Sequence, residues 1–519
     1  MAPLARGTIS HSMNGEVAPR DRQIENGVLL NGDTAAAATI ARMTATATFE
    51  SLNPSTGEVI DSFPRSTAAD VDRAVAIARA AWEDWRLVPA PERGNILFRF
   101  AQLLEQHKPE LSELMTREMG KVKAEAGGDV QEAIDMAYYM GGEGRRLFGQ
   151  TTPSELRDKF MMSVRMPVGV VGAITPWNFP IAIPAWKLMP ALVCGNTVVL
   201  KPAEDTPLLA QRFVDVLYEA GLPEGVVQIV HGFGEEAGDA LVRHPDVPVI
   251  TFTGSRETGV IVTKTAADEL KHVHLELGGK NAIIVMDDAD IDLAVDGIVW
   301  SAFGTAGQRC TAASRVIVHR AVYDQLQSKL VARTEKLRIG SPWEDDTDIG
   351  PVINETAVEK IHSYTEIGKG EGAKLLTGGE RVDGQGFYYR PTVFADVDPG
   401  MRIAQEEIFG PTTALIPVDS FEAAVRAANG VKYGLSSSIF TRDVNKAFKA
   451  MRDLQTGITY INAGTTGAEV HLPFGGMKQT GNGHREAGQA ALDVFTEWKS
   501  VYVDYSGKLQ RAQIDNVEQ

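Results

Sequence analysis

Cysteine is scarce in this sequence. Only Cys194 and Cys310 occur among 519 residues. Two thiols cannot build a disulfide framework or a four-thiolate metal site, so neither kind of scaffold is expected. Low cysteine content favours a reducing compartment. We therefore expect a cytoplasmic protein without a structural metal.

Long apolar runs and an excess of positive charge are also missing. The most apolar run, Val168 to Ile174, has the length of one strand, whereas a membrane span needs about 18 residues. The 51 Lys and Arg residues are outnumbered by 68 Asp and Glu residues, which gives a formal net charge of −17. Such an acidic surface disfavours nucleic acid and anionic membranes as partners. We therefore expect neither nucleic acid nor a membrane as a partner.

The length sets a lower limit on the number of domains. Single hydrophobic cores stop growing near ~250–300 residues, so this chain requires at least two domains. The content of 44% apolar and 23% charged residues is ordinary for a globular protein. Residues 1–47 are polar and rich in Ala and Thr, without helical or strand periodicity. We expect them to form a disordered extension.

Strands and helices alternate along most of the chain, which indicates the α/β class. Apolar spacing predicts helices at 68–85, 93–119 and 130–148, the first capped by Ser66 or Thr67. A first series of strands is predicted at 168–174, 197–200, 226–230, 249–252 and 282–285, and a second at 315–318, 393–395 and 436–440. This alternation predicts parallel sheets that bind ligands at the carboxyl ends of their strands.

Cys310 is a candidate nucleophile. Small residues dominate the run from Phe303 to Gly307 before it, which leaves a substrate carbonyl room to approach the sulfur. A thiolate is a strong nucleophile, and Arg309 or a helix N-terminus would lower the pKa of the thiol. A buried, inert cysteine is equally compatible with this segment. Cys194, which follows three apolar residues, fits that alternative.

Two polar residues are candidates for acid–base and oxyanion roles. Glu276 lies between two leucines, and an apolar setting raises a carboxyl pKa toward the range that suits a general base. A salt bridge to Lys280 is the alternative, and this segment alone favours it. Asn178 is flanked by prolines in the run 175–180, where its amide can stabilise an oxyanion. A simple turn residue is the alternative for Asn178.

Two strand ends carry groups suited to a nucleotide. Gly254 and Ser255 follow a predicted strand and begin a turn that reaches Gly259, where backbone N–H groups can hold a pyrophosphate. The spacing is not the G-x-G-x-x-G fingerprint. Lys201 and Glu204 end another strand with a cation and an acid, a pair suited to ribose hydroxyls. A solvated surface pair is the alternative.

Considered together, these segments resemble the aldehyde dehydrogenase superfamily from about residue 48 to about residue 505. Seven motifs occur in order: Thr175-Pro176-Trp177-Asn178-Phe179-Pro180, Lys201-Pro202-Ala203-Glu204, Phe252-Thr253-Gly254-Ser255, Leu275-Glu276-Leu277-Gly278-Gly279-Lys280, Gly307-Gln308-Arg309-Cys310, Glu406-Glu407-Ile408-Phe409-Gly410-Pro411 and Pro473-Phe474-Gly475-Gly476. The resemblance implies NAD(P)-dependent oxidation of an aldehyde to a carboxylic acid through a Cys310 thioester, with water as the acyl acceptor.

The resemblance also assigns roles to residues. Cys310 would attack the aldehyde, Asn178 would hold the oxyanion, Glu276 would activate water, and Lys187 would assist proton transfer. NAD is the expected cofactor, with NADP possible. The residues that would hold it are Trp177, Lys201, Ala203, Glu204, Gly254, Ser255, Gly259, Leu277, Glu407 and Phe409.

The same resemblance implies an architecture. A Rossmann-like nucleotide-binding domain would take 48–152 and 171–290, and an α/β catalytic domain would take 291–480. A small β arm at 153–170 and 488–508 would add a strand to a neighbour's sheet. We therefore expect a homodimer or homotetramer.

A narrower resemblance concerns the substrate. The segments Ile461–Glu469, Lys478–Gly483 and Val503–Leu509 are similar to the antiquitin branch, the α-aminoadipic semialdehyde dehydrogenases. That resemblance implies substrate contacts from Arg309 and from Glu132 or Asp129, with Gly467 and Ala468 nearby. The run from Gly483 to Glu486 departs from the branch, and semialdehyde dehydrogenases of sugar-acid pathways are similar as well.

Three other functions stay open at this point. A cysteine hydrolase is one, because His272 and His274 precede Glu276 on a predicted strand and share its face. A non-enzymatic role would be expected to lose Cys310, Glu276 or Asn178, yet all three are present. An acylating dehydrogenase is the third, and retention of Glu276 favours water as the acceptor.

Overall fold

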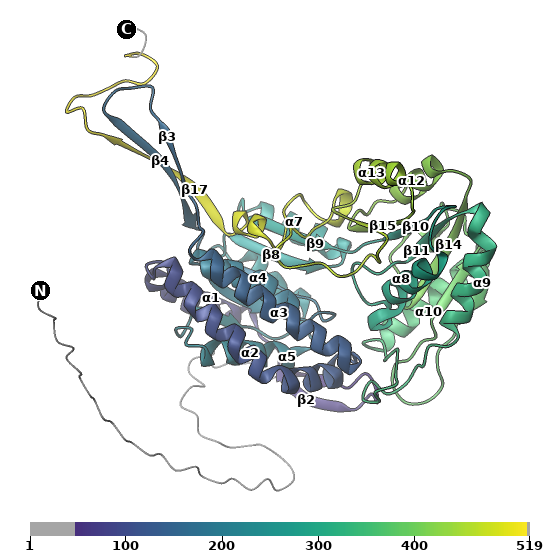
Figure 1. Ribbon diagram of the computed structural model, residues 1–519. Coiled ribbons are helices and arrows are strands. Elements are labelled where there is room, and N and C mark those ends of the chain that lie inside the picture. The colour runs from purple at the N-terminus through teal and green to yellow at the C-terminus, as the bar shows by residue number, and fades with distance from the viewer. Residues whose placement is uncertain (1–46, 516–519) are drawn as a thin grey trace, which may run out of the picture. The chain divides into compact units, whose positions relative to one another are not determined.

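The computed structural model describes residues 47–515, and it confirms the α/β class (Figure 1). The disordered extension expected at 1–47 lies outside the described residues except for Ala47. Within residues 47–515, no helix has the length and apolar character required to cross a membrane.

A five-stranded parallel sheet forms the first α/β unit, in the order β7-β6-β5-β8-β9. Its strands are β5 (Val170–Ile174), β6 (Thr197–Lys201), β7 (Val227–Ile229), β8 (Val249–Gly254) and β9 (His272–Leu277). The chain builds outward from β5 to β7 and then returns to the other side of β5. The strand order thus reverses between β5 and β8, which is where an open parallel sheet binds ligands.

Helices cover both faces of this sheet because its strands are apolar on both sides. Val198 and Leu200 of β6 pack into one core, and Val199 between them packs into another. The first core is built with α2 (Ala90–Glu118), α3 (Lys123–Glu143), α4 (Ala182–Cys194) and α5 (Pro207–Glu219); the second is built with α1 (Ala68–Trp85), α6 (Asp239–Arg243) and α7 (Arg256–Ala267). Helix α1 has the bounds predicted from the sequence, and its cap is Thr67.

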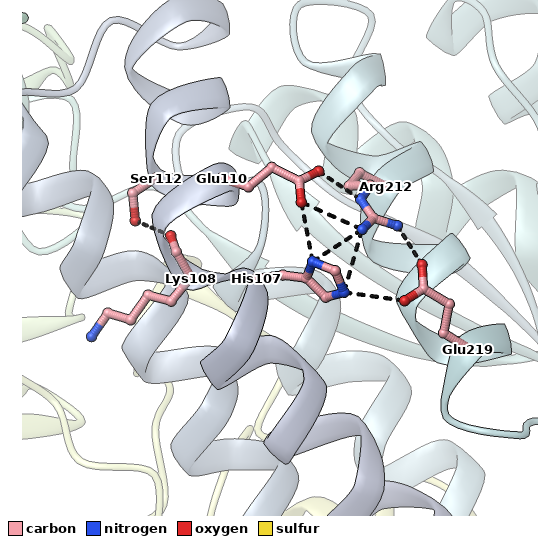
Figure 2. Close-up of polar contacts among 6 residues, drawn as sticks. All are labelled: His107, Lys108, Glu110, Ser112, Arg212 and Glu219. Atoms are coloured by element: carbon pink, nitrogen blue, oxygen red, sulfur yellow. Dashed lines mark hydrogen bonds and ion pairs between the residues drawn. The ribbon is translucent and has the colours of Figure 1, made fainter. Parts of the chain in front are cut away.

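Polar contacts join α2 to α5 at the protein surface (Figure 2). His107 of α2 contacts Glu110 through Nδ1 and Glu219 through Nε2, each at 3.1 Å. Arg212 of α5 donates to Glu110 at 2.9 Å and to Glu219 at 2.6 Å. Exposed ion pairs contribute little individually, about 0–1 kcal/mol each. The cluster therefore adds little to the packing of the two helices, which apolar side chains already hold together.

A seven-stranded sheet forms the second α/β unit, in the order β12-β13-β14-β11-β10-β15-β16. All neighbours pair in parallel except β12 and β13. The strands are β10 (Ala282–Val285), β11 (Arg315–His319), β12 (Lys374–Thr377), β13 (Thr392–Ala395), β14 (Thr412–Val418), β15 (Ser436–Phe440) and β16 (Ile458–Ile461). The helices are α8 (Ile291–Phe303), α9 (Tyr323–Thr334), α10 (Glu355–Gly370), α11 (Arg402–Gln405), α12 (Phe421–Asn429) and α13 (Val444–Asp453).

The position of β10 differs from the grouping of strands that the sequence predicted. The segment 282–285 was assigned to the first series of strands, but β10 pairs with β11 and β15 at the centre of the second sheet. A short apolar strand carries no information about which sheet it joins. Only pairing partners distant in the sequence determine that choice.

Two small antiparallel sheets complete the described chain. Strands β1 (Thr48–Leu52) and β2 (Val59–Pro64) form a hairpin. Strands β3 (Gln150–Pro153), β4 (Lys159–Pro167) and β17 (Thr496–Asp504) lie side by side in the order β17-β4-β3 (Figure 1). Residues more than 300 positions apart in the sequence pair along the full length of β17. This sheet contains the strand expected near the C-terminus.

Candidate active site

A cavity of about 540 Å³ brings together most of the predicted catalytic and substrate residues. Its walls come from α3, α4, the end of β9 and the loop after α8. Predicted residues that line it are Cys310, Glu276, Arg309, Glu132, Asp129, Gly467, Ala468 and Leu277. Residues separated by more than 300 positions in the sequence therefore share one volume.

The loop before Cys310 has an unusual backbone. Thr305, Ala306 and Gly307 are successive left-handed residues, with φ of 52°, 52° and 70°. Left-handed backbone costs free energy in residues with a Cβ, so other contacts must hold it. At Gly307 a side chain is excluded because a Cβ would collide with the carbonyl of Gly410. This turn presents the half-buried Cys310 to the cavity.

Glu125 of α3 holds that turn. Its carboxylate accepts a hydrogen bond of 2.9 Å from the Thr305 N–H and one of 3.0 Å from the Arg309 guanidinium. Sequence analysis did not identify Glu125. Its position in α3 gives no signal, since a glutamate in the first turn of a helix is usually explained by the helix dipole alone.

Arg309 does not activate the thiol as expected. Its Nε donates to Thr305 Oγ1 at 2.9 Å, and its guanidinium lies 4.6 Å from the Trp300 ring centroid, besides the contact with Glu125. Burial, followed by the charges of Glu276 and other carboxylates, raises the pKa of Cys310 to about 12. The prediction that Arg309 lowers this pKa is wrong, because the guanidinium is turned toward Glu125. The thiol therefore needs a base.

Glu276 is 3% exposed at the end of β9. Burial raises its carboxyl pKa well above the usual value, and the charge of Glu486 adds to the effect, while Lys187, Arg485 and the Gly476 N–H offset part of it. The alternative salt bridge with Lys280 does not form, since the Lys280 ammonium has no hydrogen-bonding partner among residues 47–515. Glu276 thus holds a proton more readily than an exposed carboxyl group does.

Lys187 lies behind this carboxyl group. The Lys187 ammonium forms an ion pair with Glu486 and donates a 3.0 Å hydrogen bond to the Thr251 hydroxyl. All three side chains are buried. Sequence analysis did not identify Glu486 as a site residue, because its segment lies more than 200 residues beyond Glu276.

Asn178 is 4% exposed and reaches the nucleophile loop. Its Nδ2 donates a 3.1 Å hydrogen bond to the backbone carbonyl of Gln308, two residues before Cys310. The loop after β5 thereby aims the amide at the segment that carries the thiol. An amide N–H in this place is suited to stabilise a negative oxygen that develops on a bound carbonyl.

The carboxyl ends of β6 and β8 carry the residues expected to hold the adenosine end of a dinucleotide. Lys201 at the end of β6 donates to Glu204 at 3.1 Å, and Ala203 is buried between them. Ser255 caps α7 by accepting a hydrogen bond from the Thr258 N–H. These groups flank the point where the strand order reverses, which suits a nucleotide with its phosphates at a helix N-terminus.

Groups suited to the nicotinamide end lie nearer the cavity. Trp177 and Phe409 form an edge-to-face pair with ring centroids 5.5 Å apart. Glu407 accepts a 2.8 Å hydrogen bond from the Gly279 N–H, and a Cβ at Gly278 would collide with the Glu407 carboxylate. The two glycines thus let an acid approach the backbone beside Leu277. A carboxylate held there can accept hydrogen bonds from ribose hydroxyls, so the residues fit a dinucleotide along its length.

Gly259, the last predicted cofactor residue, lies in α7 against Leu277. A Cβ at Gly259 would lie 2.6 Å from the Leu277 side chain. The glycine therefore allows the helix that Ser255 caps to pack against the end of β9. This close packing brings the predicted phosphate-binding turn and Leu277, another predicted cofactor residue, into one region.

The two acids proposed for the substrate differ in their contacts. Asp129 is buried in an ion pair with Lys121 at 2.7 Å and accepts a hydrogen bond of 2.7 Å from the Ala182 N–H. Glu132 is only partly buried, and burial followed by the Asp129 charge raises its pKa to about 8. Glu132 is thus the acid whose charge can respond to a ligand. Gly467 and Ala468 line the same cavity.

The geometry bears on the cysteine hydrolase alternative. Within the described residues, no histidine lines the cavity that contains Cys310. His272 is exposed, and His274 is buried against Thr251. A thiol–imidazole pair is therefore not formed here.

The chain is similar to known proteins along most of its length. A family model described as the aldehyde dehydrogenase family matches residues 41–501. The chain is 44% identical over 450 residues to α-ketoglutaric semialdehyde dehydrogenase of Bacillus subtilis, covering 86% of this chain and 92% of that protein. It is 43% identical over 464 residues to α-ketoglutarate semialdehyde dehydrogenase of Haloferax volcanii, covering 88% and 96%.

A solved structure is similar as well. Betaine aldehyde dehydrogenase from Staphylococcus aureus in complex with NAD⁺ matches with a TM-score of 0.88 and 35% identity. The match covers 90% of this chain and 93% of that one.

Proposed function

Because the chain belongs to the aldehyde dehydrogenase family, we propose that Cys310, Asn178, Glu276 and Lys187 carry out its reaction. The chain oxidises an aldehyde to a carboxylic acid with NAD(P) as the acceptor. The observation that carries the assignment of residues is the shared cavity, where Cys310 and Glu276 meet beside the loop reached by Asn178.

The first half of the proposed mechanism acylates the thiol. Cys310 Sγ loses its proton to solvent and attacks the aldehyde carbon as a thiolate, while the Asn178 amide donates to the resulting oxyanion. The bound nicotinamide supplies the hydride acceptor. Loss of hydride from the thiohemiacetal carbon leaves an acyl group on Cys310 as a thioester.

The second half releases the product. Glu276 takes a proton from a water molecule as the water oxygen attacks the thioester carbon. The C–S bond then breaks, which returns Cys310 and leaves a carboxylic acid. Glu276 keeps the proton until a neighbouring group accepts it. The raised pKa of Glu276 supports this role, because a base of higher pKa takes a proton from water more readily.

A panel of aldehydes tests the function. Nicotinamide reduction would be followed by absorbance with NAD and with NADP, using α-ketoglutaric, α-aminoadipic and succinic semialdehydes together with neutral aldehydes. We expect aldehyde-dependent reduction of cofactor. Ester turnover without any nicotinamide-dependent aldehyde oxidation would contradict the assignment.

We further propose that the substrate carries a carboxylate, as the names of the two semialdehyde dehydrogenases suggest. Arg309 supports this, since its guanidinium lines the cavity and is held by Glu125 and Thr305. A cation fixed in advance binds a carboxylate with less loss of entropy.

Replacing Arg309 with methionine should lower kcat/KM for a carboxylate-bearing semialdehyde by about 10- to 100-fold. A hydrogen bond to a charged group is worth roughly 1.5–3 kcal/mol, which sets that range. A neutral aldehyde of matched length is the control substrate and should change much less. Equal losses on both substrates would assign Arg309 to the nucleophile loop and not to the substrate.

The proposed cofactor preference is NAD over NADP, with Glu204 as its determinant. The carboxylate can accept hydrogen bonds from both ribose hydroxyls, whereas a 2′-phosphate would meet its negative charge. That repulsion is about 1 kcal/mol at 4 Å in water and larger where solvent is partly excluded. Lys201 opposes the effect, because its ammonium, which now pairs with Glu204, can also pair with the phosphate.

Replacing Glu204 with glutamine should therefore shift the ratio of kcat/KM values toward NADP by about fivefold to tenfold. The measurement is kcat/KM for both cofactors with one good aldehyde. Glu224→Gln is a matched control, since Glu224 is exposed and belongs to the same α/β unit. An unchanged ratio in Glu204→Gln would remove Glu204 as the determinant.

We also propose a cytoplasmic homo-oligomer with the domain division expected from the sequence, its boundary shifted to precede β10. Supporting observations are the low cysteine content and the edge positions of β16 and β17 in their sheets. Trp498 and Tyr502 on β17 are 52% and 63% exposed. Unpaired edges and exposed aromatic side chains suit pairing with a second copy. Light scattering would determine whether the assembly is a dimer or a tetramer.

A further inference from the structure

Buried polar side chains extend from the region of Glu276, beginning with Glu486, which lines the same cavity. Lys187 contacts Glu486 and donates to Thr251 Oγ1 at 3.0 Å. Thr251 Oγ1 lies 3.1 Å from His274 Nδ1. Each contact is short enough for direct proton transfer along a hydrogen bond. The proposed reaction does not use Thr251 or His274.

His274 continues this line toward the surface. Its ring is 2% exposed, and its Nε2 has no hydrogen-bonding partner among the described residues. The ring meets that of His484 edge to face, with centroids 5.5 Å apart. His484 is exposed on the loop after β16. These contacts form a route that runs from the Lys187–Glu486 pair to a titratable side chain in solvent, and the charges of that pair act on the buried Glu276, whose carboxylate oxygens have no hydrogen-bonding partner among the described residues.

The surroundings disfavour the charged form of His274. Burial lowers the pKa of His274 well below 6.5, and the charges of Lys187, His484 and Arg485 lower it further. Besides these, the titratable groups that face it are Glu486, whose Oε1 lies 3.7 Å from Nδ1, and Glu276, two residues along β9. A neutral imidazole accepts a proton at one nitrogen and releases one at the other. The Thr251 hydroxyl lies at Nδ1, so Nδ1 is the nitrogen that accepts a proton. The nitrogen that releases one is therefore Nε2, which has no hydrogen-bonding partner among the described residues.

We propose that His274 and His484 form a proton exit for Glu276, an inference that rests on the proposed role of Glu276 in deacylation. Deacylation leaves one proton on Glu276, and a water molecule in the cavity that both acids line would carry it to the Glu486 carboxylate. The Lys187 ammonium gives a proton through the Thr251 hydroxyl to His274 Nδ1 and recovers one from Glu486. His274 releases a proton from Nε2 to His484 or to a water between the rings. One proton enters at Glu276, one leaves at the surface, and no heavy-atom bond changes.

His274 and His484 are positioning residues for this transfer, since neither touches the substrate. A purely structural role for His274 would require only its shape and the contact with Thr251. Glutamine approximates both but cannot accept and release a proton at two ring nitrogens. His274→Gln therefore separates the two roles.

The experiment measures steady-state kinetics of the full-length protein with one good aldehyde. In His274→Gln we expect kcat to fall about tenfold, because proton exit becomes rate-limiting after acylation. The value of kcat/KM should change less than about twofold, since the exit follows the first irreversible step. The solvent deuterium isotope effect on kcat should rise, and added imidazole should restore part of the loss. His484→Gln should lower kcat in the same direction.

Controls keep the outcomes distinct. His231→Gln replaces another buried histidine, located after β7 and outside the route, and should show neither the isotope effect nor imidazole rescue. Parallel losses of kcat and kcat/KM in His274→Gln without rescue, or a wild-type kcat, would overturn the proposal. A wild-type kcat in His484→Gln would remove His484 from the route. Failure of the proposed function would be seen separately, as normal deacylation in Glu276→Gln.

Discussion

Replacing Cys310 with alanine should abolish aldehyde oxidation, with a loss on the order of 10⁴-fold or more. Cys310 is the only thiol in the cavity, and alanine can form neither the thiohemiacetal nor the thioester. Binding of NAD should survive, because the groups proposed to hold the cofactor lie on other loops. Initial rates of NADH formation and titration with NAD measure the two properties.

Cys194→Ala is the matched control. Cys194 is fully buried at the end of α4, and burial raises the pKa of its thiol to about 12. Its loss removes a small apolar side chain from the core and should leave turnover per folded molecule nearly unchanged. Substantial turnover by Cys310→Ala, with a folded control, would contradict the assignment of the nucleophile.

Replacing Glu276 with glutamine should slow turnover by about 10²–10⁴-fold, the usual cost of losing a general base. The loss should fall on deacylation, because glutamine cannot take a proton from water. Rapid mixing should then show a burst of NADH equal to the active sites, followed by slow turnover. Mass spectrometry should detect the acyl group on Cys310.

The burst of NADH in Glu276→Gln depends on the step of the reaction in which Glu276 acts. The pKa of Cys310 is raised to about 12, so its proton must leave before attack. If Glu276 accepts that proton as well, the burst of NADH in Glu276→Gln will be slow or lost, which would contradict a role confined to deacylation. Glu113→Gln, at an exposed position of α2, is the control and should behave as the unmodified protein.

Local patterns predicted much of the fold. Thr67 and the apolar spacing after it gave the bounds of α1, and the strand at 282–285 has the bounds of β10. Where the structure differs from these predictions, tertiary packing accounts for the difference. Helix α3 begins at Lys123, seven residues before its predicted start, because Gly127 and Gly128 weaken the local helical signal. Packing of Ala126 and Val130 in the core compensates for that weakness.

The site could be predicted only where its residues lie in recognisable motifs. Cys310, Glu276 and Asn178 were each identified in this way, and two of them line one cavity while the third reaches its loop. Glu125 and Glu486 were not identified, because each of them contacts residues that lie far from it in the sequence. The direction in which the Arg309 side chain points was not predicted, for the same reason. A guanidinium beside a thiol in sequence turns toward whichever carboxylate the fold supplies, and here that is Glu125.

The attachment of the nucleophile turn to Glu125 has a consequence for protein engineering. Helix α3 forms a wall of the substrate cavity and also anchors the strained backbone from Thr305 to Gly307. Exchanging the whole helix to change selectivity would therefore loosen the reactive thiol at the same time. Gly128 lines the same wall, and a Cβ there would meet no atom within 4 Å. Larger side chains at that one position can reshape the cavity while the anchor at Glu125 stays intact.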